Sequence, residues 1–323
     1  MGGRPCRLTE TVKRNFTGKV TIMEALIMQL FNGISLSSIL LLTALGLAIT
    51  FGLMNVINMA HGEFIMVGAY TTYVVQNIFL LLPNHFFNLY YVFALPAAFI
   101  TAAAIGWAIE VVMIRHLYGR PLDSLLVTWG VSLVLQQLAR TVFGTPNVDV
   151  RSPSWLLGTV KITNTIQLPV NRLFIIGLVI AICTITYVVL YKSRNGRRIR
   201  AVMQNRNMAM CLGIPVRTVD SFTFAAGSGL AGVAGSTIAL IGSIGSSLGQ
   251  NYIVDTFMTV VLGGVGKIAG TVAGSVLIGV GNPTAEFFTG ASAGKVIVLF
   301  LVIIFLQFRP KGLVTISSRS LEE

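Results

Sequence analysis

The sequence predicts an all-α fold: a polytopic membrane bundle of about eight to nine transmembrane helices, some of them short or broken. Of its 323 residues, 54% are hydrophobic and only 11% are charged, whereas a soluble domain carries about 25% charged residues. The mean hydropathy is +0.80. Several apolar stretches reach about 20 residues, the length that an α-helix needs to cross a bilayer. We therefore expect an integral membrane protein.

The apolar spans follow one another along the chain. They are expected at residues 26–53, 64–82, 91–114, 125–143, 173–191 and 222–241. A polar connection at residues 144–172 separates the fourth span from the fifth. A long apolar run then covers residues 253–281, and a last span is expected at residues 296–308.

The basic residues set the orientation of these spans, because short cytoplasmic connections are enriched in Lys and Arg. Basic clusters at residues 115–120, 192–217 and 309–311 are all expected in the cytoplasm. An even number of crossings must then separate residue 217 from residue 309. We therefore expect the 253–281 run to form two short spans, broken near residues 263–267. The count becomes about nine, with an external N-terminus.

Residues 1–22 differ from the rest in being polar and basic. They are expected to form a disordered or interfacial tail, or to reflect a mis-called start, with Met23 as an alternative first residue. Residues 23–323 are expected to form a single transmembrane domain.

Composition and spacing argue against several classes of function. The net charge of +12 lies between the apolar spans, where the positive-inside rule places it, and so does not indicate nucleic-acid binding. Cys6, Cys183 and Cys211 are too widely spaced for a metal or disulfide framework. Residues 227–232 match G-x-G-x-x-G by letter, but that motif requires a preceding strand. The sequence has no P-loop and no second His one turn from His61. We therefore expect this chain to hold no metal, to bind no cofactor and not to be an enzyme.

Polar residues inside or beside the spans are candidates for the translocation path, because such residues are costly in lipid. Residues 55–63 concentrate several of them between the first two spans. They are expected to form an ordinary cytoplasmic turn, with a broken-helix element near the transport path as the alternative. The candidate path residues are Asn55, Asn58, His61, Glu63, Gln136, Gln137, Asn282 and Glu286.

Residues 192–217 form a polar island that contains seven Lys or Arg residues and no Asp or Glu. A short helix is expected from Arg197 to Leu212, with Gly213 just past its end and Pro215 as a stop. A basic loop would satisfy the positive-inside rule without any partner. Apolar residues at helical spacing instead favour a helix that docks in the groove of a partner protein, so residues 193–220 are assigned as a cytoplasmic coupling segment.

These segments together resemble the inner-membrane permeases of branched-chain amino acid-type ABC importers. The resemblance rests on GLMNVINMAHGEF (residues 52–64), GRRIRA (196–201), VLGGVG (261–266) and RPKGL (309–313). Within that family the chain is most similar to the B-type permease of urea ABC transporters. The discriminating segment is YGRPLDSLLVTWGVSLVLQQLAR (residues 118–140).

The resemblance implies a bacterial inner-membrane subunit of an ATP-driven importer. It implies a heterodimer with a second, related permease, two cytoplasmic ATPase subunits that bind ATP and magnesium, and an extracytoplasmic substrate-binding protein. The family's coupling element falls on residues 196–214. The candidate coupling residues are Gly196, Arg197, Arg200, Ala201, Asn205, Met208, Ala209, Gly213 and Ile214.

The substrate expected from this resemblance is urea, with branched-chain amino acids or short amides as the alternative. A passive urea or ammonium channel would also be an apolar helix bundle with few charges. Such a channel has no need of a coupling helix, so the basic island favours the ATP-driven importer.

Overall fold

Helices make up nearly all of the chain that the computed structural model describes, which comprises residues 7–54, 58–81, 83, 87–118, 120–161, 167–310 and 312–314. Within these ranges the helices are α1 (Arg7–Met54), α2 (His61–Leu80), α3 (Tyr90–Val112), α4 (Pro121–Phe143), α5 (Val170–Lys192), α6 (Arg194–Gln204), α7 (Arg206–Cys211), α8 (Val216–Ala239), α9 (Leu248–Gly263), α10 (Ile268–Thr289) and α11 (Ala291–Phe308). Strands β1 (Thr159–Lys161) and β2 (Gln167–Pro169) form a small antiparallel hairpin. The predicted all-α membrane bundle is confirmed.

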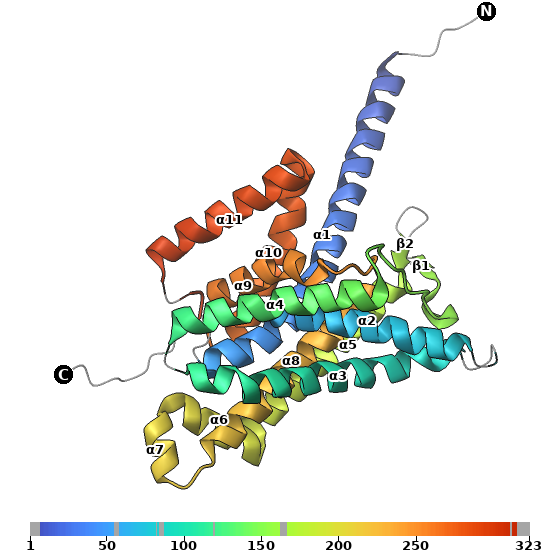
Figure 1. Cartoon of the computed structure of the whole chain (residues 1–323). Helices are drawn as coiled ribbons and strands as arrows, with labels where there is room; N and C mark the ends of the chain where they lie inside the picture. Colours follow the sequence, from blue (N-terminus) through green and yellow to red (C-terminus); the bar gives the residue numbers. More distant parts are fainter. Residues whose placement is uncertain are drawn as a thin grey trace, which may run out of the picture.

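Within the described residues, six helices are long and apolar enough to cross a membrane. They belong to α1, α3, α4, α5, α8 and α10. Nine crossings would also require α2, α9 and α11, so that count stays a prediction. The first helix begins at Arg7 and therefore includes most of the segment that was expected to be a separate tail. Its first turns extend beyond the other helices (Figure 1, blue).

Helix α8 lies at the centre of the bundle and packs against α1, α2 and α3. The small residues along α8 allow the neighbouring helices to approach it closely. A Cβ atom at Gly68 of α2 would lie 2.0 Å from the carbonyl oxygen of Gly232, and one at Gly235 would lie 1.9 Å from that of Ile65. Any side chain at these positions would separate the two helices. In lipid, where helix association depends on van der Waals packing, such contacts hold helices together.

The α9–α10 connection interrupts the long apolar run at residues 253–281. A break there was expected because an even number of membrane crossings must separate residue 217 from residue 309. Helix α9 ends at Gly263 and α10 begins at Ile268. Gly264 and Gly266 adopt φ angles of +100° and +84°, which glycine reaches without steric cost. The predicted break is confirmed.

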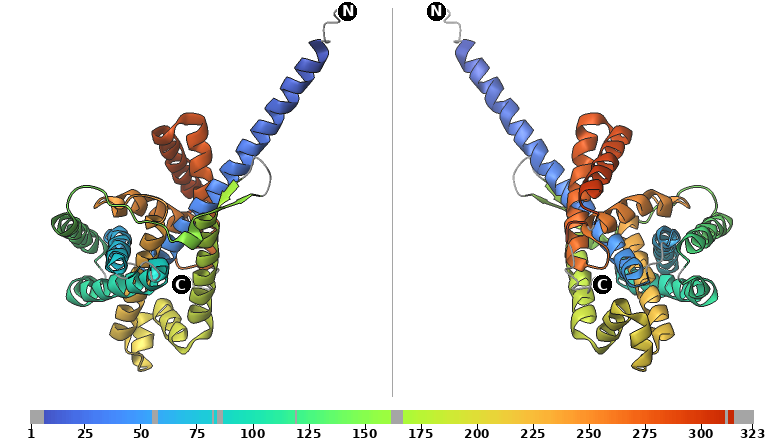
Figure 2. Two further views of the ribbon diagram at one scale, coloured as in Figure 1. Left: turned by 90° about the vertical axis from the view of Figure 1, so that its right-hand side faces the viewer. Right: turned by 90° about the vertical axis from the view of Figure 1, so that its left-hand side faces the viewer.

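The two ends of the bundle carry different features. The β1–β2 hairpin lies at one end, and α6 and α7 lie at the other (Figure 1). The latter end is the one that the basic residues assign to the cytoplasm. Both views in Figure 2 show the α10–α11 hairpin beside α1 and apart from α2, α3 and α4.

Candidate functional site

The coupling segment is two short helices rather than the single helix expected from Arg197 to Leu212. Helix α6 ends at Gln204 and α7 begins at Arg206. Asn205 separates them because its backbone is extended and its side chain caps α7, accepting a hydrogen bond of 3.0 Å from the N–H of Met208. The expected end is confirmed: Gly213 has a φ of +75°, and the N–H of Ile214 donates to the oxygen of Ala209.

Some apolar residues of this segment are buried against the bundle, and others are exposed. Ile199 and Val202 of α6 are buried, and Ala209 packs with Val202 and Val216 in a small apolar cluster. Met208, Met210 and Leu212 are instead 58%, 52% and 72% exposed. Met208 and Leu212 are four residues apart and so lie on one side of this segment, and we call these two residues the α7 apolar surface.

The candidate coupling residues divide in the same way. Arg197, Arg200, Asn205, Met208 and Gly213 are exposed, Ala201 and Ile214 are partly buried, and Gly196 and Ala209 are buried. The two buried residues therefore hold α6 and α7 in place and do not present side chains to a partner. At Gly196, an added Cβ would lie 2.2 Å from the oxygen of Leu190, so only glycine lets α6 turn back against α5.

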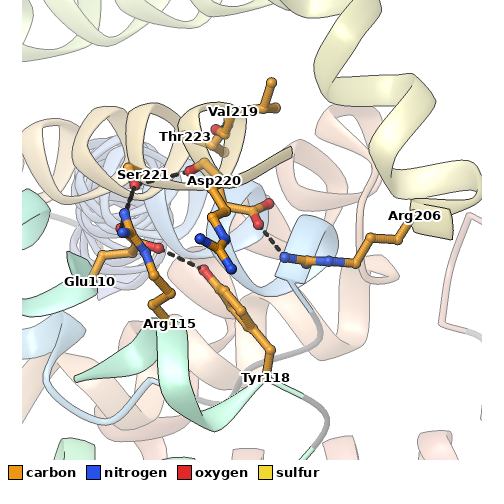
Figure 3. Close-up of polar contacts among 9 residues, drawn as sticks. Glu110, Arg115, Tyr118, Arg206, Val219, Asp220, Ser221 and Thr223 are labelled. Atoms are coloured by element: carbon orange, nitrogen blue, oxygen red, sulfur yellow. Dashed lines mark hydrogen bonds and ion pairs between the residues drawn. The ribbon is translucent and has the colours of Figure 1, made fainter. Parts of the chain in front are cut away.

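A polar cluster ties α7 to the membrane helices (Figure 3). Arg206 of α7 forms an ion pair with Asp220 of α8, and its guanidinium carbon lies 4.5 Å from the centre of the Tyr118 ring. The Tyr118 hydroxyl donates to Glu110 of α3 over 3.1 Å. Contacts between side chains thus run without a gap from α7 to α3 and α8.

The far side of this cluster is fixed by the fully buried Glu110. Ser221 of α8 donates to its carboxylate, and Arg115 forms an ion pair with it at 3.4 Å. Arg115 also donates to Ser221 over 3.0 Å. We refer to Glu110, Arg115, Tyr118, Arg206, Asp220 and Ser221 as the α3–α7–α8 cluster. Breaking a buried ion pair leaves an uncompensated charge, so these contacts hold the three helices in one arrangement.

The start of α2 lies within the bundle and not at its cytoplasmic edge. His61 Nε2 lies 3.2 Å from the carbonyl oxygen of Thr43. Thr43 is eleven residues before the end of α1 at Met54, which corresponds to about 16 Å along a helix. The N–H of Met59 likewise donates to Thr128, seven residues into α4. Residues 58–61 therefore already lie within the bundle where α2 begins, and the expectation of an ordinary cytoplasmic turn is wrong.

Several polar atoms at this internal helix start have no hydrogen-bond partner among the described residues. They are Asn58 Nδ2, His61 Nδ1 and Glu63 Oε2, and all three side chains are buried. Buried polar groups are normally hydrogen-bonded. Unpaired groups at a broken helix inside a membrane protein are a feature of substrate or ion pathways. The alternative interpretation, a broken-helix element, fits this geometry.

A stripe of polar side chains on α4 faces the start of α2. Its members are spaced by four residues and are all buried: Ser124, Thr128, Ser132 and Gln136. Ser132 Oγ and Gln136 Nε2 both donate to Glu63 Oε1 over 2.8 Å. We call these four residues the α4 polar stripe. It supplies hydroxyl and amide groups over about 18 Å of helix.

A second polar site is a cleft that α1, α9, α10 and the α8–α9 connection enclose. A cavity of about 510 Å³ and a neighbouring cavity of about 470 Å³ share Leu36, Ile39, Ile241, Pro283 and Glu286 in their walls. Lys295 and Asp255 also line it, 3.9 Å apart. Asn282 hydrogen-bonds to Asp255, while its Oδ1 has no partner among the described residues. This cleft therefore offers charges of both signs and an amide.

The candidate path residues thus divide between two places. Asn58, His61 and Glu63 lie at the start of α2, where Gln136 of α4 donates to Glu63. Asn282 and Glu286 line the cleft. Gln137 is exposed on α4 and does not belong to the buried stripe, and Asn55 lies outside the described residues. Sequence reasoning missed Ser124, Thr128 and Ser132, although their four-residue spacing was visible. It also missed Asp220, Tyr118 and Lys295, whose partners are distant in the sequence.

No metal site is found in the part of the chain that the structure describes: no group of three or more His, Cys, Asp or Glu side chains could hold an ion there.

Comparison with known proteins places the whole bundle in one family. The sequence profile described as "Branched-chain amino acid transport system / permease component" matches residues 29–306. The permease protein LivH of a high-affinity branched-chain amino acid transport system from Salmonella typhimurium is 29% identical over 290 residues, covering 88% of this chain and 94% of LivH. BraD of Pseudomonas aeruginosa, a permease protein of the same description, is also 29% identical, with the same coverage.

A similar relative occurs in an archaeon. The probable branched-chain amino acid transport permease protein LivH of Methanocaldococcus jannaschii is 28% identical over 314 residues, covering 88% of this chain and 91% of that protein. No solved structure gives a significant match.

Proposed function

The chain belongs to the family of branched-chain amino acid transport system permease components, and from that premise we propose that it forms the translocation path for urea in an ATP-driven importer of the bacterial inner membrane. The role of an ABC permease subunit in a multi-pass inner-membrane protein follows from the family and from six membrane-length helices. The substrate, the path and the partner contacts are the proposed part.

The observation that carries urea as the substrate is the α4 polar stripe. Urea is small, neutral and rich in donors and acceptors, and hydroxyl and amide groups can exchange hydrogen bonds with it without a fixed charge. The stripe lies within residues 118–140, the segment that most resembles urea permeases. The unpaired atoms of Asn58, His61 and Glu63 adjoin it and add donors and acceptors.

Branched-chain amino acids are the second candidate, and a different observation favours them. The cleft beside α1 and α10 holds Asp255, Glu286 and Lys295, and opposite charges suit a zwitterion. The related permeases LivH and BraD are named for branched-chain amino acid transport. Uptake of labelled urea and labelled leucine, measured in cells with and without this gene, separates the candidates. Loss of urea uptake alone supports our proposal, and loss of leucine uptake alone contradicts it.

The cleft also supports a second permease as partner. A charge at the centre of a bilayer costs about 2.5–3.5 kcal/mol on insertion scales, so a cleft lined by Asp255, Glu286, Lys295 and Arg172 is unsuited to facing lipid. A related permease packed against α1 and α10 would cover it and complete a path for substrate. The α7 apolar surface would dock on one of two cytoplasmic ATPase subunits, which bind ATP and magnesium, and the β1–β2 end would face an extracytoplasmic binding protein.

A further inference from the structure

A groove between α3 and α8 opens at the cytoplasmic end of the bundle. Its volume is about 480 Å³, and Trp107, Arg115, Arg217, Thr218 and Phe222 contribute to its walls. Trp107 and Phe222 are more than half exposed. The groove is separate from the α4 polar stripe and from the cleft beside α10, and transport as proposed above makes no use of it.

The polar end of this groove carries a net positive charge. Among the described residues, Arg217 forms no ion pair, and it is exposed in the first turn of α8. Arg115, Ser221 and Tyr118 all contact the carboxylate of Glu110. The Nε atom of Arg115 is buried and has no partner among the described residues. Two arginines and one buried carboxylate leave one net positive charge. The first turn of α8 adds the partial positive charge of a helix N-terminus, which favours phosphate.

The apolar end of the groove continues along the surface of α3. Trp107, Ile100 and Phe93 are exposed and follow one another at seven-residue intervals, which places them on one side of the helix. From Trp107 to Phe93 this stripe covers about 21 Å, more than the roughly 15 Å depth of one leaflet's hydrocarbon. Tryptophan beside arginine at this level is typical of the membrane–water interface.

We propose that this groove binds one anionic phospholipid of the inner leaflet. Arg217, Arg115 and the first turn of α8 contact the phosphodiester, and an acyl chain lies along Trp107, Ile100 and Phe93. A single phosphodiester carries one negative charge, which matches the net charge of the groove. Basic pockets between transmembrane helices on the cytoplasmic side are suited to such headgroups.

Quenching of Trp107 fluorescence by brominated lipid tests this site directly. The full chain, with Trp129→Phe and Trp155→Phe so that Trp107 is the sole tryptophan, is reconstituted in phosphatidylcholine bilayers. Increasing fractions of dibrominated phosphatidylglycerol or dibrominated phosphatidylcholine are then added. We expect half-maximal quenching at a mole fraction of the anionic lipid about fivefold or more below that of the neutral lipid.

Two arginine variants show whether the groove causes this preference. Arg217→Gln should reduce the preference about fivefold, and Arg217→Lys should retain part of it. Arg120→Gln removes the same charge from an exposed cytoplasmic position and should leave the preference unchanged. Gel filtration confirms that each variant is folded, and Arg217→Lys serves as the folded test variant if Arg217→Gln is not.

Three results would overturn the proposal. Equal quenching by both lipids would show that the groove does not select anionic lipid. Absence of quenching by either lipid would show that protein covers this face. Loss of the preference on addition of inorganic phosphate would identify a site for free phosphate. None of these results depends on which substrate the importer carries.

Discussion

Arg206 of α7 forms an ion pair with Asp220 of α8, a residue only 3% exposed, while the Arg206 guanidinium also lies over the ring of Tyr118. This pair links the short cytoplasmic helices to the central helix of the bundle. Because Tyr118 in turn bonds to Glu110 of α3, movement of α7 would pull on both α3 and α8. We therefore expect the pair to matter for coupling as well as for stability.

Replacing Arg206 with Gln should leave the carboxylate of Asp220 buried and unpaired. The free energy of unfolding should fall by up to about 3 kcal/mol, the lower end for a buried pair, because Arg206 is 35% exposed. ATP-driven uptake should fall more than the amount of folded transporter. The exchanged pair Arg206→Asp with Asp220→Arg should restore part of both.

Arg120→Gln is the matched control, since the Arg120–Asp123 pair is exposed and such pairs contribute about 0–1 kcal/mol. If Arg206→Gln behaved like Arg120→Gln in both thermal unfolding and uptake, the Arg206–Asp220 pair would have no role in coupling.

Replacing Leu212 with Asp should separate the permease from its ATPase subunits. Leu212 is exposed on the α7 apolar surface, so the change should not disturb the bundle, but it places a charge in the proposed docking contact. Co-purification of the ATPase subunits should fall at least tenfold, as about 1.4 kcal/mol of lost binding would produce. Ala209→Asp is a poor test, because Ala209 is buried and its replacement would disrupt α7 itself. Full ATPase binding by Leu212→Asp would move the docking contact elsewhere.

Replacing Gln136 with Leu should reduce urea uptake sharply, because it interrupts the α4 polar stripe and removes a hydrogen bond from Glu63. Leaving a buried acceptor short of a partner costs about 1–3 kcal/mol, so thermal stability should also fall. Gln137→Leu makes the same change one residue away, on the exposed face of α4, and should leave uptake near normal. Equal uptake by the two variants would exclude the stripe from the path.

Replacing Gly68 with Ala should destabilise the bundle by separating α2 from α8. The added methyl group would lie 2.0 Å from the Gly232 oxygen, and overpacking of this kind costs about 1–3 kcal/mol. Gly177→Ala in α5 is the control, since nothing lies within 4 Å of its added Cβ. Thermal unfolding in detergent gives both values, and equal midpoints would contradict the close packing described here.

Much of the bundle could be predicted from sequence, because apolar length and basic connections are local signals. The α9–α10 break followed from counting crossings, and Gly264 and Gly266 supply the backbone conformations that it needs. The position of residues 58–61 inside the bundle was expected only as the alternative, because it depends on contacts with Thr43 and Thr128, which are distant in the sequence. The division of the coupling segment at Asn205 was missed because a capping side chain can also occupy a helix interior.

The candidate site was predicted in part for the same reason. Glu63 and Gln136 were each named as polar residues of the spans, but their direct hydrogen bond joins positions 73 residues apart. The cluster around Glu110 depends on α3, α7 and α8 meeting, which no local pattern encodes. The spacing of the α4 polar stripe along one helix face could be predicted from the sequence. Contacts between residues on different helices could not.

The most direct test of the central claim is uptake of labelled urea into membrane vesicles that contain the assembled importer. Uptake should require both ATP hydrolysis and the intact chain, and it should be abolished by Leu212→Asp while the chain remains folded in the membrane. Unlabelled urea should compete and unlabelled leucine should not. Urea uptake that continued undiminished without the ATPase subunits would instead identify a passive channel and contradict this account.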